Sequence, residues 1–365
     1  MKKIKKLLQK ILKNFFHFIF KLIYGKIIYD KNNLVSSDIF IDFVENKNII
    51  NYFKKKYKIY KIMQGRIYTD NVENVAIINK NNIINNISYQ QILGNLTSAD
   101  KNICINKGTP RIKKNFKGRV LSLAQGASGN FNYYHWLFDM LPKIKLYSEI
   151  YDIKDLDYLY LGNPKNYQVQ TLMPLGLGEV NIIDSQKYRH IQADEIICSD
   201  PISYYSGYVM EQSQHIPLWT IKWLRDTFLE CAKKFKCNDK IFIDRSSSKS
   251  KHCQFINNQE ISEFLIKKGF TKYKTENLNF FEEVYLFKNA NYVIGAHGAG
   301  LANLSFCKKG TKIIEIRPKN YSNPLYSKLS EINNLDYRLI STDIAETEDY
   351  SNGDINIDIN QLKNL

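Results

Sequence analysis

The hydrophobic pattern changes character along this 365-residue chain. Residues 4–15 place apolar side chains at helical spacing against lysines, and residues 15–24 are apolar nearly all round, so we expect an N-terminal helix. Residues 34–110 hold short Ile/Val-rich runs between Asn- and Lys-rich turns, which is typical of irregular β structure. Between residues 118 and 200, strand-length apolar runs alternate with helix-length segments, which indicates an α/β fold.

A second α/β stretch begins with the apolar run Lys240–Ile243. Pro217 precedes a helical pattern over residues 218–235, which we expect to link the two lobes. The length of the chain allows two domains with a core each. The predicted organisation is a basic amphipathic helix (1–30), an N-terminal domain (31–216), a linking helix (217–237), a C-terminal domain (238–345) and an acidic tail (346–365) that we expect to fray.

The N-terminal segment is strongly basic. Eight lysines and no acidic residue lie within residues 1–26, so this segment supplies half of the net charge of +16. The apolar run over residues 15–24 is about half of the roughly 20 residues that a membrane span needs, and no small-residue cleavage site follows it. We therefore expect a helix that lies on an anionic membrane surface, with docking on the protein's own surface as the alternative.

Composition narrows the classes of function and the compartment. Lysine is abundant throughout the chain, as are Asn, Ile and Tyr, and the charge is accompanied by no zinc finger, aromatic RNA-binding pattern or heptad repeat, so nucleic acid is a minor alternative partner. Six scattered cysteines without a C-x-x-C pair fit neither a disulfide framework nor a zinc site. We expect a reducing, cytoplasmic setting.

A glycine-rich turn follows the apolar run at residues 292–294. The turn reads Gly-Ala-His-Gly-Ala-Gly over residues 295–300, then a helix-like segment (301–306) and a second strand-like run (313–316) follow. Strand, glycine turn, helix and strand in this order are typical of a nucleotide site, because glycine lets the backbone approach a phosphate closely. The alternative is a tight turn that needs glycine only for its geometry.

Two other motifs resemble this turn and fail on detail. The order of Gly295, Gly298 and Gly300 does not match the dinucleotide fingerprint G-x-G-x-x-G. An esterase oxyanion loop would require a G-x-S-x-G elbow elsewhere, and the nearest candidate, at residues 126–130, lacks the final glycine.

An aromatic cluster over residues 132–142 carries a second candidate site. We expect a helix over residues 133–150, on which His135 and Asp139 are four residues apart and share one face. A carboxylate beside a histidine can orient the ring for acid–base chemistry or for binding a charged ligand. The alternative is an aromatic helix packed in the core, with the histidine merely satisfied by the carboxylate.

The two clusters together resemble glycosyltransferase family 61, whose bacterial members are commonly labelled capsular polysaccharide biosynthesis proteins. The resemblance rests on H-W-x-x-D at residues 135–139, then on GAHGAGLANLSF and KIIEIRP downstream, and covers roughly residues 120–340. In between, the family shows a strand that ends in arginine, a basic stretch and an asparagine that opens a helix, here Arg245, residues 249–251 and Asn257. The family's second arginine is replaced by lysines and His252, and lysine cannot make arginine's bidentate contact with phosphate.

The resemblance implies a GT-B architecture, in which two Rossmann-like domains face each other across a cleft. It also implies a nucleotide-sugar donor, bound mainly by the C-terminal domain, and no metal or other cofactor. A metal-dependent glycosyltransferase would carry an Asp-x-Asp motif, and the candidate at residues 155–157 is better explained as a solvated loop.

By the same resemblance, Arg245 holds donor phosphate with help from a lysine, and the turn at residues 297–300 stabilises the leaving diphosphate through its N–H groups. Glu315 is placed to accept hydrogen bonds from ribose, with burial as a structural partner as the alternative. The predicted donor-binding residues are Arg245, Lys249, Lys251, His297, Gly298, Ala299, Gly300 and Glu315.

Family members of this type are expected to invert the anomeric carbon, which requires one base. Asp139 is the first candidate and His135 the second, with a purely structural role for Asp139 as the alternative. The sequence therefore predicts a bacterial hexosyl- or pentosyltransferase of capsule or lipopolysaccharide synthesis at the inner face of the cell membrane, with a glycan or lipid-linked glycan as acceptor. The rival hypothesis is a non-catalytic glycan- or nucleotide-binding protein on the same fold.

Overall fold

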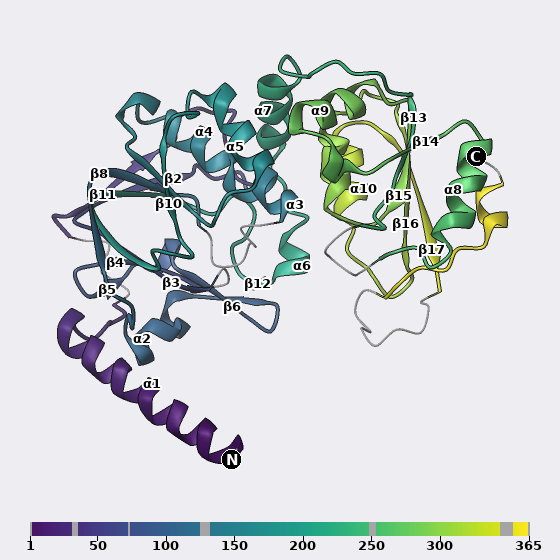
Figure 1. The fold of residues 1–365 in the computed structure, drawn as a ribbon. Helices are drawn as coiled ribbons and strands as arrows, with labels where there is room; N and C mark the ends of the chain where they lie inside the picture. Colours follow the sequence, from purple (N-terminus) through teal and green to yellow (C-terminus); the bar gives the residue numbers. More distant parts are fainter. Residues whose placement is uncertain are drawn as a thin grey trace. The chain divides into compact units, whose positions relative to one another are not determined.

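The computed structural model describes residues 2–30, 36–71, 74–124, 132–247, 253–343 and 353–363. The chain divides into two compact units (Figure 1). The first unit comprises Met1–Lys165 and Gly176–Pro217, and the second comprises Asn166–Leu175 and Leu218–Leu365. The helix that we expected to link two lobes is thus part of the second unit.

Four parallel strands form one part of the sheet of the first unit. They are β8 (Lys114–Ser122), β9 (Tyr158–Leu161), β10 (Asn181–Asp184) and β11 (His190–Ser199), in the order β10-β9-β8-β11. The chain steps outward from β8 to β10 and then returns to the other side of β8. The strand order therefore reverses between β8 and β11, which is where open α/β sheets place ligands.

The remaining strands of the first unit add an antiparallel part to the same sheet, so the Rossmann-like pattern expected for this domain holds only for the four parallel strands. Two-residue turns at Lys80-Asn81 and Leu93-Gly94 join neighbouring strands, and links this short allow only antiparallel pairing. The added strands are β1 (Ile39–Phe43), β2 (Lys58–Met63), β3 (Arg66–Asn71), β4 (Asn74–Asn79), β5 (Asn82–Ile83), β6 (Tyr89–Ile92), β7 (Asn95–Thr97) and β12 (Gly207–Tyr208).

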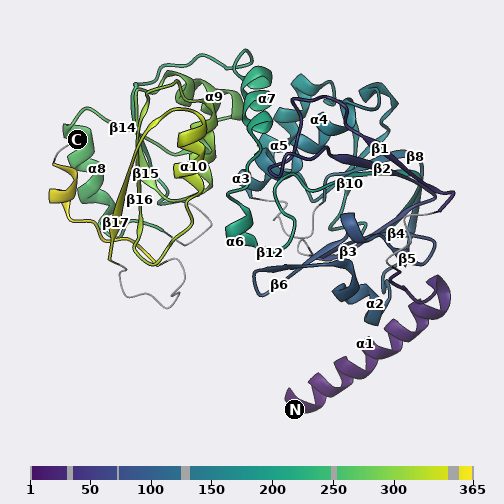
Figure 2. The same ribbon diagram turned by 180° about the vertical axis from the view of Figure 1, so that it is seen from behind.

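The short helices of the first unit lie beside this mixed sheet (Figure 2). The core under them is built from alternate strand residues such as Ile62, Ile77, Val120 and Ile196. The helices are α1 (Lys2–Tyr24), α2 (Ile103–Lys107), α3 (Tyr133–His135), α4 (Pro142–Ser148) and α6 (Val209–Gln212).

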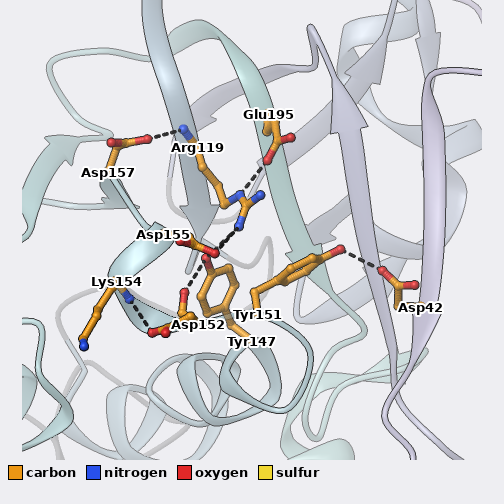
Figure 3. A network of polar contacts seen from close by, with 9 residues as sticks. All are labelled: Asp42, Arg119, Tyr147, Tyr151, Asp152, Lys154, Asp155, Asp157 and Glu195. Carbon is orange, nitrogen blue, oxygen red and sulfur yellow. Dashed lines mark hydrogen bonds and ion pairs between the residues drawn. The ribbon is translucent and has the colours of Figure 1, made fainter.

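Strand β8 carries a polar network at Arg119 (Figure 3). The Arg119 guanidinium donates to Glu195 over 2.5 Å and lies 3.7 Å from the Asp155 carboxylate. The Arg119 backbone N–H donates to the Asp157 carboxylate over 2.7 Å. Both carboxylates of the Asp-x-Asp sequence therefore bond to protein groups.

The same network reaches further through two tyrosines (Figure 3). The Tyr147 hydroxyl donates to the Asp152 carbonyl over 3.3 Å, and the Tyr151 hydroxyl donates to the Asp42 carboxylate over 2.7 Å. The Arg119 guanidinium lies over the Tyr151 ring, 4.9 Å from its centroid. These contacts tie α4 and the loop after it to strands β1, β8 and β11.

We expect Gly118→Ala to lower the free energy of unfolding by about 1–3 kcal/mol, because Gly118 has φ +100° and a Cβ there would overlap the Asp157 carboxylate. Gly207→Ala is the matched control, since Gly207 has φ +84° and no atom within 4 Å of an added Cβ. Denaturant unfolding of both variants separates backbone strain from the clash. Equal losses in the two variants would contradict the role given to the Asp157 contact.

The second unit is a five-stranded parallel sheet in the order β14-β13-β15-β16-β17. Figures 1 and 2 show α8 on one face of it, and α9 and α10 on the other. The order reverses between β13 and β15, which is a second topological switch point. The elements are β13 (Lys240–Ile243), β14 (Thr271–Tyr273), β15 (Tyr292–Ala296), β16 (Lys312–Pro318), β17 (Asp336–Thr342), α5 (Asn166–Leu172), α7 (Leu218–Phe228), α8 (Asn258–Lys267), α9 (Phe280–Asn289) and α10 (Leu325–Ile332).

Two expectations for the second unit were wrong in extent. Helix α7 ends at Phe228 rather than near residue 235, and the Lys233 backbone N–H beyond it donates to the Phe281 carbonyl of α9. The acidic tail is packed over its described part, where Ile355 and Leu362 are fully buried in the core. Apolar residues alternate with the acidic ones here, so the tail can cover the sheet.

Candidate functional site

In the first unit, the candidate residues follow the carboxyl end of β8. The Asn132 side chain caps α3 by accepting from the N–H groups of Tyr134 (2.9 Å) and His135 (3.4 Å). The helix then widens into a π-helical turn over Trp136–Met140, where the Leu141 N–H donates to the Trp136 carbonyl over 2.8 Å. We had expected one regular helix over residues 133–150, but Pro142 has no N–H to continue it, and the wider turn absorbs that loss.

His135 and Asp139 are brought together by this turn. The His135 Nδ1 lies 2.6 Å from Asp139 Oδ2, and the Tyr204 hydroxyl lies 3.1 Å from the same nitrogen. Asp139 is fully buried, whereas His135 is partly exposed. A carboxylate at Nδ1 fixes the ring and leaves Nε2 as its basic nitrogen.

Tyr204 comes from the segment that follows β11, so the group lies where the strand order reverses between β8 and β11. The buried lysine Lys143 lies one turn beyond Asp139, and its Nζ donates to the Ala124 carbonyl over 3.2 Å. Burial lowers the pKa of Lys143 to about 8, against the opposing effect of Cys198 and Asp139. The buried carboxylate therefore has two basic side chains close to it, and it can stabilise positive charge on the imidazole.

In the second unit, Arg245 follows β13 and the glycine-rich turn follows β15, at the carboxyl ends of two neighbouring strands. The Arg245 guanidinium donates to the His297 carbonyl. A Cβ at Gly298 would overlap this guanidinium, so only glycine allows the approach. Burial lowers the pKa of Arg245.

Side chains from β16 and β17 hold the His297 ring. Its Nδ1 lies 2.5 Å from Glu315 Oε1, and the Tyr337 hydroxyl donates to Glu315 Oε2 over 2.5 Å. Glu315 is fully buried and His297 is 5% exposed. Both oxygens of Glu315 are therefore engaged by side chains, and the ribose contact stays a prediction.

Two tyrosines enclose the same turn. The His297 ring lies 4.3 Å from the Tyr321 ring and 5.0 Å from the Tyr326 ring, measured between centroids. The Tyr326 hydroxyl donates to the Gly298 carbonyl over 2.6 Å. The helix that follows is a 3₁₀ helix over Ala299–Phe306, whose first bond joins the Leu301 N–H to the Gly298 carbonyl. The turn is rigid, and its position is fixed by its neighbours.

A family model described as Glycosyltransferase 61 matches residues 133–314, which is about half of the chain and contains both clusters. The chain belongs to glycosyltransferase family 61. It is similar to beta-1,2-xylosyltransferase RCN11 of Oryza sativa subsp. japonica, with 35% identity over 65 residues. That segment is 18% of this chain and 12% of the rice protein, so the chain spans a small part of that relative.

The predicted site residues thus fall into two groups. His135 and Asp139 lie together in the first unit, and Arg245, the turn at 297–300 and Glu315 lie together in the second. Lys249 and Lys251, predicted as phosphate contacts, lie outside the described residues. Within the described parts of the chain, no group of three His, Cys, Asp or Glu side chains is placed to hold a metal ion. Metal independence stays a prediction.

Sequence reasoning missed the tyrosines at both sites and a buried ion pair. Tyr204, Tyr321 and Tyr326 lie outside the motifs, and no spacing rule connects them to a histidine. Asp244 is fully buried and accepts from Lys272 over 3.1 Å, a pairing that depends on the contact between β13 and β14. The one sign of this ion pair in the sequence was an aspartate directly before the predicted phosphate-binding arginine.

Proposed function

We propose that this glycosyltransferase moves a sugar from a nucleotide-sugar donor to a glycan hydroxyl with inversion of the anomeric carbon. One observation carries the proposal: each of the two sequence clusters lies at a topological switch point of its own sheet. The His135–Asp139 pair is at the β8/β11 reversal, and the Arg245–Gly298 contact is at the β13/β15 reversal.

In the proposed step, His135 Nε2 takes the proton of the acceptor hydroxyl as its oxygen bonds to the anomeric carbon. The bond from that carbon to the donor phosphate breaks, and the nucleotide leaves with the electron pair. Arg245 and the N–H groups of the turn after β15 stabilise the charge that develops on the leaving phosphate.

We assign the base to His135 rather than to Asp139, which the sequence had favoured. Asp139 is fully buried behind the ring, so its carboxylate is placed to orient the imidazole and to stabilise it when it gains the proton. His135 is the member of the pair with exposed surface. Asp139 is therefore a positioning residue.

Bacterial surface polysaccharide synthesis at the inner face of the membrane is the proposed setting, with the two-domain GT-B layout as the proposed architecture. The structure contains no described helix long and apolar enough to cross a membrane. Helix α1 is followed by Gly25 (φ +81°) and is held to α2 by Lys21, whose Nζ donates to the Asn106 carbonyl over 2.6 Å. Its exposed apolar side chains support contact with lipid, namely Ile4, Leu7, Leu8, Ile11, Leu12, Phe15, Phe16, Phe18, Leu22 and Ile23.

A donor screen on the full chain tests the proposed function. UDP-, GDP- and CMP-linked sugars, UDP-xylose among them because of the rice relative's name, are titrated with and without EDTA. We expect saturable binding of one nucleotide class and slow hydrolysis of the donor, both indifferent to EDTA. Binding without turnover in the presence of glycan acceptors would favour a non-catalytic binding protein, and loss of both with EDTA would contradict metal independence.

A further inference from the structure

A pocket of about 440 Å³ opens in the first unit beside the last turn of α1. Three cationic side chains line it, Arg66, Lys80 and Lys113, together with one carboxylate, Asp38. Asp38 is paired with Lys80 over 2.8 Å. The remaining two cations face the pocket with no carboxylate among its lining residues to balance them.

Arg66 is the deepest of these cations. It is 5% exposed, and its guanidinium donates to neutral groups, the Lys80 carbonyl, the Asn81 side chain (2.9 Å) and the Tyr24 carbonyl (3.4 Å). Its Nε is buried and has no hydrogen-bond partner among the described residues. A buried charge of this kind is costly unless a counter-charge accompanies it.

Lys113 adds a second cation next to the first. Its Nζ donates to the Gln192 side chain and lies 5.8 Å from the centroid of the Tyr24 ring. Burial and the Arg66 charge lower the pKa of Lys113, which shows that the two cations repel each other. An anion bound between them would remove this repulsion and would accept charge-assisted hydrogen bonds from both.

The pocket also adjoins apolar surface. Ile23 and Tyr24 of α1 contribute to its lining, and Leu22 and Ile23 are 68% and 60% exposed. An anionic group in the pocket could therefore continue into an apolar chain that lies along α1. A soluble anion would use the cations and leave this apolar border unused.

We propose that this pocket binds the phosphate group of a membrane lipid, with Arg66 and Lys113 as its ligands and the acyl part of the lipid beside the end of α1. The inference rests on the proposal that α1 lies on a membrane surface, and it adds a specific lipid site to a general electrostatic attraction. Such a site would hold the enzyme at a fixed depth and orientation on the surface where a lipid-linked acceptor is found.

Vesicle binding by the full chain tests the site. The probes are phosphatidylcholine vesicles with and without phosphatidate, and the variants are Lys113→Gln in the pocket and Lys10→Gln on the exposed part of α1. Both variants lose one positive charge, and general attraction alone predicts an equal loss of about fivefold for each. We expect Lys113→Gln to weaken binding to phosphatidate vesicles at least about tenfold, since it also loses a charge-assisted hydrogen bond. Equal losses would overturn the proposal.

Thermal shift with soluble probes separates a lipid from a free phosphate. We expect short-chain phosphatidate below its micellar concentration to raise the Tm of the wild type and of Lys10→Gln, and to leave the Tm of Lys113→Gln unchanged. An equal rise with inorganic phosphate would assign the pocket to a soluble ligand and overturn the lipid assignment. A rise in Tm that is the same in all three proteins would overturn the proposal that Lys113 binds the lipid phosphate. Nucleotide-sugar turnover, measured separately, shows whether the proposed activity itself has failed.

Discussion

His135→Gln is expected to lower kcat by about 10²–10⁴-fold, the usual contribution of general base catalysis. Glutamine keeps a polar side chain on the π-helical turn, but it cannot take a proton from the acceptor hydroxyl. The donor Kd should stay unchanged, because the proposed donor-binding residues lie in the second unit. Steady-state kinetics with the donor and acceptor found by screening, together with donor titration, measure both quantities.

Two further variants separate the base from the groups that position it. Asp139→Asn keeps the shape of the side chain but cannot stabilise the imidazolium, so we expect a large loss of kcat. Tyr204→Phe removes only the hydroxyl 3.1 Å from Nδ1 of His135, and we expect it to lower kcat far less than Asp139→Asn does. If His135→Gln retained most of its kcat while Asp139→Asn lost it, the base would be Asp139 and our assignment would be wrong.

Arg245→Ala is expected to lower kcat/KM for the donor by about 10²–10³-fold, the usual effect of removing one donor to the charge that develops in the transition state. The variant also leaves the His297 carbonyl without its guanidinium donor. The Tm and the circular dichroism spectrum must therefore be measured beside the kinetics. Isothermal titration with the nucleotide and with the intact donor separates lost binding from lost catalysis.

Arg245→Lys and Gly298→Ala are the matched variants for this prediction. Lysine keeps the charge but cannot make the bidentate contact, so we expect a partial loss. Gly298→Ala keeps the arginine at position 245, but the added methyl group displaces its guanidinium from the turn. We therefore expect Gly298→Ala to lower kcat/KM for the donor as well. Unchanged kcat/KM in a folded Gly298→Ala variant would contradict the arrangement that we describe.

The elements that local pattern controls could be predicted from the sequence. The strand at 240–243 lies where an apolar run placed it, and the apolar run at 292–294 lies within the strand at 292–296. The pairing of His135 with Asp139 also followed from spacing, because four residues on a helix span about one turn. These features depend on neighbours in the sequence.

Other features depend on contacts between distant segments, and sequence spacing could not supply them. Tyr204 reaches His135 only because β11 returns beside β8, and Glu315 is occupied only because Tyr337 on β17 reaches it. The segment after α7 forms a hydrogen bond to residue 281, a contact that no local signal encodes. The pocket at Arg66 likewise combines residues from α1, from strands β2, β3, β4 and β11, and from the segments that join or precede them.

The anomeric configuration of the first product is the most direct test of the central claim. A single displacement with His135 as base and Arg245 on the leaving phosphate requires the product to carry the configuration opposite to that of the donor. Proton NMR of the reaction, run with the donor identified by binding, reads this from the coupling of the anomeric proton. The account predicts an inverted signal from the earliest time point, and a retained configuration would contradict it.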